Sequence, residues 1–171
     1  MMKEIAKIFL VLTFILSISA CERKSCQNVV CPTGQSCNSG QCYCQDGLEG
    51  TNCTEYSYEK YVRTYNYTSE SCNPVTPFST GSVFIQHDFS SSLNQIQIYN
   101  LMGGYCTYVT AVIRTDYSNK GNILEIPEQN YNCSGNIVSG QGTYDALNNR
   151  INLQLYYTFG GLSYQCNTIL Q

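Results

Sequence analysis

Residues 151–159 read INLQLYYTF, and apolar side chains recur at every second position of this segment. Ile151, Leu153, Leu155, Tyr157 and Phe159 therefore share one face of an extended chain. This alternation is typical of a β-strand that buries one face in a core and exposes the other to solvent. It is the clearest strand pattern in the chain.

The chain around this segment has the same character. Tyr, Thr, Val, Ile and Asn are frequent beyond residue 60, and pairs such as Gly103-Gly104, Asn148-Asn149 and Gly160-Gly161 mark turns. In one of these segments Val83, Ile85 and Phe89 are expected on one face with His87. No stretch has a sustained helical period, so residues 61–171 are predicted to form an all-β domain, a barrel or a sandwich. About eight antiparallel strands are expected, at 61–68, 82–89, 95–101, 105–115, 122–126, 136–144, 151–159 and 164–170.

The N-terminus has the features of an export signal. Lys3 and Lys7 precede an apolar run from Ile8 to Leu16, which is shorter than the ~20 residues of a membrane-spanning helix. Residues 1–20 are therefore predicted to be a secretory signal peptide, with a retained membrane anchor as the alternative.

The end of this segment, Ile18-Ser19-Ala20-Cys21, resembles the bacterial lipobox. The resemblance implies cleavage before Cys21 and attachment of a diacylglycerol to its thiol, with residues 21–25 as a short tether. Several acyl chains, at ~0.8 kcal/mol per buried CH₂, anchor a protein stably without a helix. The alternative is ordinary cleavage that leaves Cys21 free or paired. Glu22 stands where an Asp is associated with inner-membrane retention, so the outer membrane is favoured, and the side that the protein faces is left open.

Six cysteines between residues 26 and 53 are spaced Cys-x4-Cys-x5-Cys-x4-Cys-x-Cys-x8-Cys. This spacing, with Gly47 and Gly50, resembles an EGF-like module, although Leu48 stands where an aromatic residue is common. The resemblance implies the disulfides Cys26–Cys37, Cys31–Cys42 and Cys44–Cys53. A segment this short cannot bury a sufficient core, and each disulfide contributes ~2–4 kcal/mol instead.

The expected role of this module is a stalk or an interaction module, joined to the β domain by a polar linker at 54–60. Its spacing lacks the two separated CxxC pairs of a zinc site. Arg23 and Lys24 precede it where a calcium-binding module carries oxygen ligands. We therefore expect no metal and no cofactor.

Four cysteines remain in the β domain, namely Cys72, Cys106, Cys133 and Cys166, and they allow three pairings. The preferred one is Cys72–Cys166, which joins the end of the first strand to the last, together with Cys106–Cys133. With Cys21 lipidated and six cysteines in the module, the odd total of 11 leaves no reactive thiol.

The order of parts resembles small EGF-bearing lipoproteins of the Bacteroidota, which carry a lipocalin-like or uncharacterised β domain. Tyr61-Val62-Arg63-Thr64-Tyr65 looks like the opening strand of such domains, with Arg63 where Gly is frequent. The resemblance implies a bacterial cell envelope protein.

Candidate catalytic residues are few. His87 is the only histidine, and Asp88 and Ser90 lie too close in sequence to form a triad on one strand, because neighbours point to opposite faces. Glu125, Glu128 and Asp116 are interpreted as solvated loop acids. We expect no enzymatic activity.

The low content of charged residues limits the class of partner that the protein can bind. Charged residues make up 12% of the chain, about half of the ~25% usual for soluble domains, and the net charge is −3. With so few Lys and Arg residues, the composition argues against nucleic acid, whose phosphates require basic clusters.

Fourteen of the 15 tyrosines lie beyond Cys53, where they serve either the core or a surface that stacks on sugars or proteins. The predicted function is non-catalytic binding of a protein or glycan at the cell envelope, with a lipocalin-like carrier of a small apolar ligand as the alternative. The oligomeric state is not predicted.

Replacing the predicted lipidated residue tests the anchor. Cys21→Ser should abolish labelling of the protein by a fatty-acid probe and release it from the membrane fraction, because no thiol remains at the lipobox. Unchanged labelling of the Cys21→Ser protein would show that the acyl chains are elsewhere or absent.

Overall fold

The computed structural model describes residues 26–75, 81–104, 106–116, 118–130, 133 and 135–171. The predicted signal peptide, the tether at 21–25 and the lipid attachment at Cys21 lie outside the described residues. No helix in the described part of the chain is long and apolar enough to cross a membrane.

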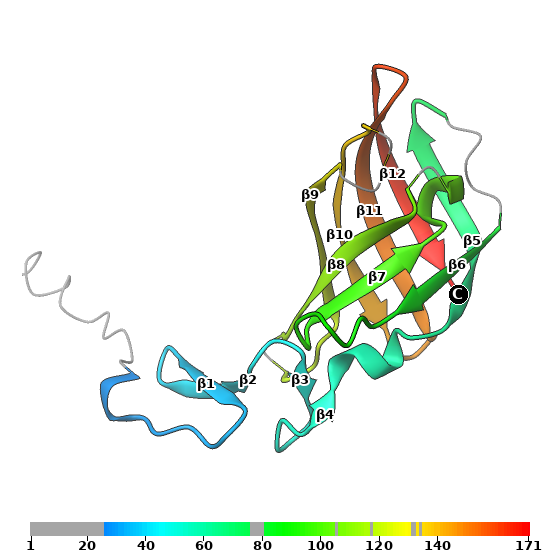
Figure 1. Cartoon of the computed structure of the whole chain (residues 1–171). Helices are drawn as coiled ribbons and strands as arrows, with labels where there is room; N and C mark the ends of the chain where they lie inside the picture. Colours follow the sequence, from blue (N-terminus) through cyan, green and yellow to red (C-terminus); the bar gives the residue numbers. More distant parts are fainter. Residues whose placement is uncertain (1–25, 76–80, 105, 117, 131–132, 134) are drawn as a thin grey trace, which may run out of the picture.

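Eight antiparallel strands form a closed barrel (Figure 1). The strands follow one another around the barrel in chain order, and the last, β12, pairs with the first, β5. The prediction of an all-β fold with about eight antiparallel strands is confirmed, and of its two architectures the chain adopts the barrel. The strands are β5 (Thr64–Asn73), β6 (Ser82–Gln86), β7 (Gln95–Tyr99), β8 (Tyr108–Arg114), β9 (Ile123–Gln129), β10 (Val138–Asp145), β11 (Arg150–Phe159) and β12 (Leu162–Leu170).

Short hairpins make this sequential order possible. Gly160 and Gly161 join β11 to β12 with φ of 58° and 80°, which are the two positive values that a type I′ turn requires. Asn149, at φ 53°, ends the turn between β10 and β11. Two of the turn pairs expected from the sequence therefore connect neighbouring strands.

The barrel interior is filled by the inward face of each strand. On β11, Ile151, Leu153, Leu155 and Tyr157 are buried, as their alternation in the sequence predicts. Gly140 and Gly142 of β10 lie opposite Leu155 and Leu153. A Cβ added at Gly142 would lie 2.4 Å from the Leu153 side chain and 2.7 Å from the Asn152 carbonyl oxygen. Leucine side chains thus occupy the space that these glycines leave.

The strand predicted at 82–89 ends earlier than expected. Strand β6 stops at Gln86, and Asp88 begins a turn in which its carbonyl oxygen accepts a hydrogen bond from the Ser91 N–H, 2.8 Å away. Phe89 lies in this turn and is 85% exposed. The expectation that Phe89 shares the inner face of Val83 and Ile85 is therefore wrong, because a local turn overrides the alternation.

The segment before the barrel consists of short elements held by disulfides. These elements are a 3₁₀ turn at Cys26–Asn28, β1 (Gln35–Asn38) paired with β2 (Gln41–Cys44), and β3 (Leu48–Glu49) paired with β4 (Glu55–Tyr56). Cys26–Cys37, Cys31–Cys42 and Cys44–Cys53 are bonded, which are the pairs that the EGF-like resemblance implies.

Two further disulfides lie in the barrel. They join Cys72 to Cys166 and Cys106 to Cys133, which is the pairing preferred from the sequence among three alternatives. Cys72 and Cys166 are direct cross-strand partners on β5 and β12. This disulfide therefore crosses the seam at which the barrel closes.

Residues 54–60, expected as a polar linker, are ordered against both neighbours. Glu55 and Tyr56 form β4, and a 3₁₀ turn follows at Ser57–Lys60. Ser57 is fully buried against Gly121, where an added Cβ would lie 2.4 Å from the Ser57 Cβ. The connection is thus packed against the barrel.

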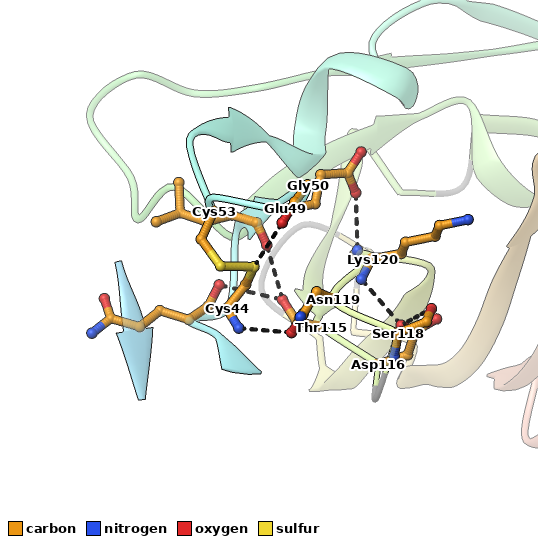
Figure 2. The surroundings of a disulfide bond; sticks show 12 residues. Cys44, Glu49, Gly50, Cys53, Thr115, Asp116, Ser118, Asn119 and Lys120 are labelled. Atoms are coloured by element: carbon orange, nitrogen blue, oxygen red, sulfur yellow. Dashed lines mark hydrogen bonds between the residues drawn. A yellow bond between two sulfur atoms is a disulfide. The ribbon is translucent and has the colours of Figure 1, made fainter. Parts of the chain in front are cut away.

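The hairpin between β8 and β9 contacts the disulfide-rich segment directly (Figure 2). Asn119 accepts a hydrogen bond from the Cys44 N–H through its side-chain oxygen, at 3.0 Å, and from the Gly50 N–H through its carbonyl, at 3.2 Å. Glu49 accepts a bond from the Gly121 N–H at 2.9 Å.

A second group of bonds lies beside these. Asp46 pairs with Arg114 at 2.9 Å and accepts a hydrogen bond from the Thr115 N–H at 2.9 Å. Both charged side chains are partly exposed, so the ion pair itself adds little stability. Backbone N–H groups on both sides donate these hydrogen bonds, which hold the Cys44–Cys53 segment against one end of the barrel.

Filling the space at Gly142 tests the packed interior. Gly142→Val should lower the free energy of unfolding by about 1–3 kcal/mol, because the new side chain overpacks the core against Leu153. Urea unfolding measures the change, with Thr143→Val on the exposed face of the same strand as the control. Equal stability of Gly142→Val and the parent protein would indicate an unfilled interior.

Candidate functional site

A row of aromatic rings crosses the outer face of three neighbouring strands. Phe84 of β6, Tyr99 of β7 and Tyr108 of β8 are direct cross-strand partners. Their ring centroids are 5.2 Å apart between Phe84 and Tyr99, and 5.5 Å apart between Tyr99 and Tyr108. Phe84 is 41% exposed, and both tyrosines are half-buried. The rings therefore lie side by side on the outer face of the barrel. Figure 1 shows β6, β7 and β8 as neighbouring strands of the barrel wall.

Two glutamines of the next row hold the central tyrosine. The Gln86 amide donates to the Tyr99 hydroxyl at 2.7 Å, and that hydroxyl donates to the Gln97 side-chain oxygen at 2.7 Å. Gln86 also donates to Gln97 at 3.4 Å. We call Phe84, Tyr99, Tyr108, Gln86 and Gln97 the aromatic platform. Its hydrogen bonds hold the Tyr99 ring in place.

A groove of about 380 Å³ adjoins the platform on β7, β8 and β9. Gln97 and Tyr108 belong to both, and the groove continues over Gln95, Thr110 and Val112. Asp88 and Glu128 supply carboxylates to its lining. The platform and groove together present ring faces, amides and a hydroxyl, and the Asp88 carboxylate accepts a hydrogen bond from the Gln97 amide at 3.4 Å.

Gln129 shapes the β9 side of this groove. Backbone pairing between β8 and β9 covers Val112–Arg114 and Ile123–Glu125. Beyond it, the Gln129 side chain replaces a backbone partner for Thr110: it accepts from the Thr110 N–H at 2.9 Å and donates to the Thr110 carbonyl at 2.8 Å. Gln129 is buried, so these bonds keep the backbone of β8 satisfied where the ladder stops.

His87 lies at the end of the barrel and does not join a catalytic group. Its ring stacks on Tyr58 with 4.0 Å between centroids, and Phe89 packs edge-on against it at 5.1 Å. It is 8% exposed, and neither ring nitrogen has a hydrogen-bond partner among the described residues. An imidazole in this setting fills space between aromatic rings.

The neighbours of His87 are bonded to each other. Ser90 donates its hydroxyl proton to Asp88 at 2.6 Å, and its N–H donates to the same oxygen at 2.9 Å. These two bonds lower the pKa of Asp88. The Ser90 hydroxyl is thus directed to the carboxylate rather than to the imidazole, and the arrangement caps a turn.

The other candidate acids are separated. Glu125 pairs with Arg114 at 2.9 Å on the outer face. Asp116 organises the hairpin between β8 and β9, where bonds from the Ser118 and Lys120 amides and from two side chains outweigh its partial burial and lower its pKa. Glu128 is exposed on β9. No three His, Cys, Asp or Glu side chains of the described residues are grouped to hold a metal.

The tyrosines divide between core and surface. Tyr61, Tyr65 and Tyr157 are buried in the barrel, and the Tyr61 hydroxyl donates to the Gly121 carbonyl at 2.7 Å. Burial raises the pKa of both Tyr61 and Tyr65. Tyr99 and Tyr108 lie on the outer face. Some tyrosines therefore belong to the core, as one of the two alternatives expects, and others lie on the surface.

The platform was not identified from the sequence, although part of its signal is there. Phe84, Gln86, Gln97 and Tyr99 stand at the outward positions of segments whose other positions are aliphatic. What the sequence lacks is the cross-strand register that aligns Phe84, Tyr99 and Tyr108.

No protein-family model, curated protein or solved structure matches this chain.

Removing the Gln129 amide tests its role beside the groove. Gln129→Ala should lower the free energy of unfolding by about 1–3 kcal/mol, because the half-buried Thr110 backbone loses both of its hydrogen bonds to the Gln129 side chain. Hydrogen exchange at the Thr110 amide should accelerate with it. Glu128→Ala, at the exposed neighbouring position, is the control, and protection of the Thr110 amide unchanged by Gln129→Ala would contradict the assignment.

Proposed function

We propose that this chain is an exported, lipid-anchored protein of the bacterial envelope whose barrel binds a neutral glycan on the aromatic platform. The single observation that carries the proposal is the row Phe84, Tyr99 and Tyr108, whose central ring is held by Gln86 and Gln97 of the neighbouring row. The binding is non-catalytic, because the platform contains no nucleophile paired with a base.

The chemistry of the platform matches a sugar. A pyranose has apolar C–H faces, which pack on aromatic rings, and a rim of hydroxyl groups that both donate and accept hydrogen bonds. Gln86 and Gln97 carry an amide each, which likewise has donors and an acceptor. Tyr99 and Tyr108 present amphipathic rings suited to such a ligand.

The charges around the platform favour a neutral glycan over an acidic one. The five platform side chains are uncharged, and Asp88 and Glu128 add carboxylates to the adjoining groove. These carboxylates would repel a uronate or a sulfated sugar. A neutral oligosaccharide is therefore the expected ligand, and an acidic one should bind more weakly.

Preorganisation supports a binding role. The central Tyr99 ring is held by two hydrogen bonds and by rings on both sides. A ligand that stacks on it does not have to order a free side chain, and avoiding that cost improves affinity. A protein partner, the other possibility from the sequence, would use a larger surface than five side chains.

A carrier of an apolar ligand is disfavoured by the interior. Leucine side chains cover Gly140 and Gly142, and the rings of Tyr61 and Tyr65 are buried in the core. The sequential closed barrel is the topology of a carrier, but its described inner face is occupied by its own side chains.

Export and anchoring are proposed on the sequence features at 1–21. Five disulfides among the described residues support an oxidising location. The EGF-like resemblance at 26–53 supports a spacer between the lipid at Cys21 and the barrel.

Substitution of the central tyrosine tests the platform. The full chain, purified in detergent, is titrated with cellohexaose, laminarihexaose and mannohexaose by calorimetry, and with polygalacturonate as an acidic glycan. Tyr99→Ala should weaken binding of the preferred hexaose at least about tenfold, equivalent to ~1.4 kcal/mol, because the central ring and its hydrogen bonds are lost. Tyr99→Phe keeps the ring and should lose less.

Tyr43→Ala, in the disulfide-rich segment, is the matched control and should bind like the parent protein. Binding that is equal in Tyr99→Ala and the parent protein would contradict the platform. Failure of all three neutral hexaoses, or tighter binding of polygalacturonate, would contradict the neutral-glycan proposal. An apolar small molecule that copurifies with the barrel would favour the carrier instead.

A further inference from the structure

A second concave surface lies on the other side of the barrel. It has a volume of about 610 Å³ and is formed on the outer faces of β5 and β9–β12. In the ring of eight strands, β11 is four positions from β7 in either direction, so this surface is opposite the platform (Figure 1). We call it the amide groove. Its outward side chains are Ser71, Ile123, Gln141, Thr143, Asn152, Gln154, Asn167 and Ile169.

Cross-strand register places the polar side chains in rows. Gln141, Gln154, Asn167 and Ser71 are successive partners across β10, β11, β12 and β5. Gln141 donates to the Gln154 side-chain oxygen at 3.2 Å. The next row is Thr143, Asn152 and Ile169. One row across the groove thus consists of three amides and a serine hydroxyl.

No charged side chain lines this groove. The outward positions of β8 and β9 differ from this lining, because they carry the charged pair Arg114 and Glu125. Four amides and two hydroxyl groups offer donors and acceptors together, which is the pattern that sugar hydroxyls require. Ile123 and Ile169 supply apolar contact for C–H groups. An anion or a cation finds no counter-charge in this lining.

We infer that the amide groove is a second site for a neutral oligosaccharide, so that one barrel binds two glycan chains on opposite faces. The inference takes its ligand class from the proposed function of the platform and adds the site and the valency. The groove relies on amides with isoleucine, whereas the platform relies on aromatic stacking, so the two sites are expected to differ in affinity.

Two opposed sites have a consequence for an anchored protein. They face away from each other, so a short oligosaccharide cannot occupy both. A long polysaccharide or a multivalent surface can engage both sites of one molecule or bridge several molecules, and avidity then exceeds either single affinity. The protein would cross-link glycan chains at the membrane rather than hold one.

Stoichiometry tests the inference directly. The full chain in detergent is titrated by calorimetry with the neutral hexaose that binds best, at concentrations that saturate both sites. The parent protein should bind two equivalents. The double variant Gln154→Ala/Asn167→Ala should bind one, and Tyr99→Ala should lose most of the other. Gln165→Ala, outward on β12 and outside the groove lining, is the matched control and should bind two.

The outcomes separate the groove from the platform. One equivalent in the parent protein that is insensitive to Gln154→Ala/Asn167→Ala overturns the groove and leaves the platform standing. One equivalent that is lost in this double variant, but not in Tyr99→Ala, overturns the bivalent barrel and the platform. A parent protein that sediments as a dimer, and a double variant that sediments as a monomer, would assign the groove to a second copy and overturn the inference.

Discussion

Closure of the barrel between β5 and β12 is the constraint on which the other features depend. The pairing runs from Tyr67 with Leu170 to Asn73 with Gln165, and the Cys72–Cys166 disulfide crosses it. A closed sheet has no edge strands to protect from other chains. It also divides every strand into an inward and an outward set of side chains. Because the inward set fills the core, the proposed binding surfaces lie on the outward set.

The outward side chains of the barrel are mostly uncharged polar and aromatic groups. Charged residues make up only 12% of the chain, and the outward side chains named above are mostly amides, hydroxyls and tyrosines. On β6–β8 these groups surround a row of rings, and on β10–β12 they line a groove. The disulfide-rich segment is bonded to the hairpin between β8 and β9, through Asn119 and Gly121. The platform strands therefore keep a fixed orientation relative to that segment.

The alternation of apolar residues along the chain predicts the individual strands well, but it does not predict how the strands pair into a barrel. The strand at 151–159 and its inward residues follow from sequence, because a period of two needs only neighbouring residues. Phe89 was misplaced because the turn begun by Asp88 ends β6 early. The choice of barrel over sandwich depends on β5 pairing with β12, and the platform depends on register across β6, β7 and β8. Both are long-range pairings that no single segment encodes, and the sequence therefore showed many tyrosines without showing which ones share a surface.

The account claims above all that ligand binds outside the barrel. Backbone amide chemical shifts of the full chain, recorded by NMR during titration with the best neutral hexaose, test this claim most directly. It predicts shifts at Phe84, Gln97, Tyr99 and Tyr108 early in the titration, and at Gln154 and Asn167 later. Shifts concentrated at the inward Ile85, Ile98 and Leu155 would contradict it, as would the absence of any shift at saturating hexaose.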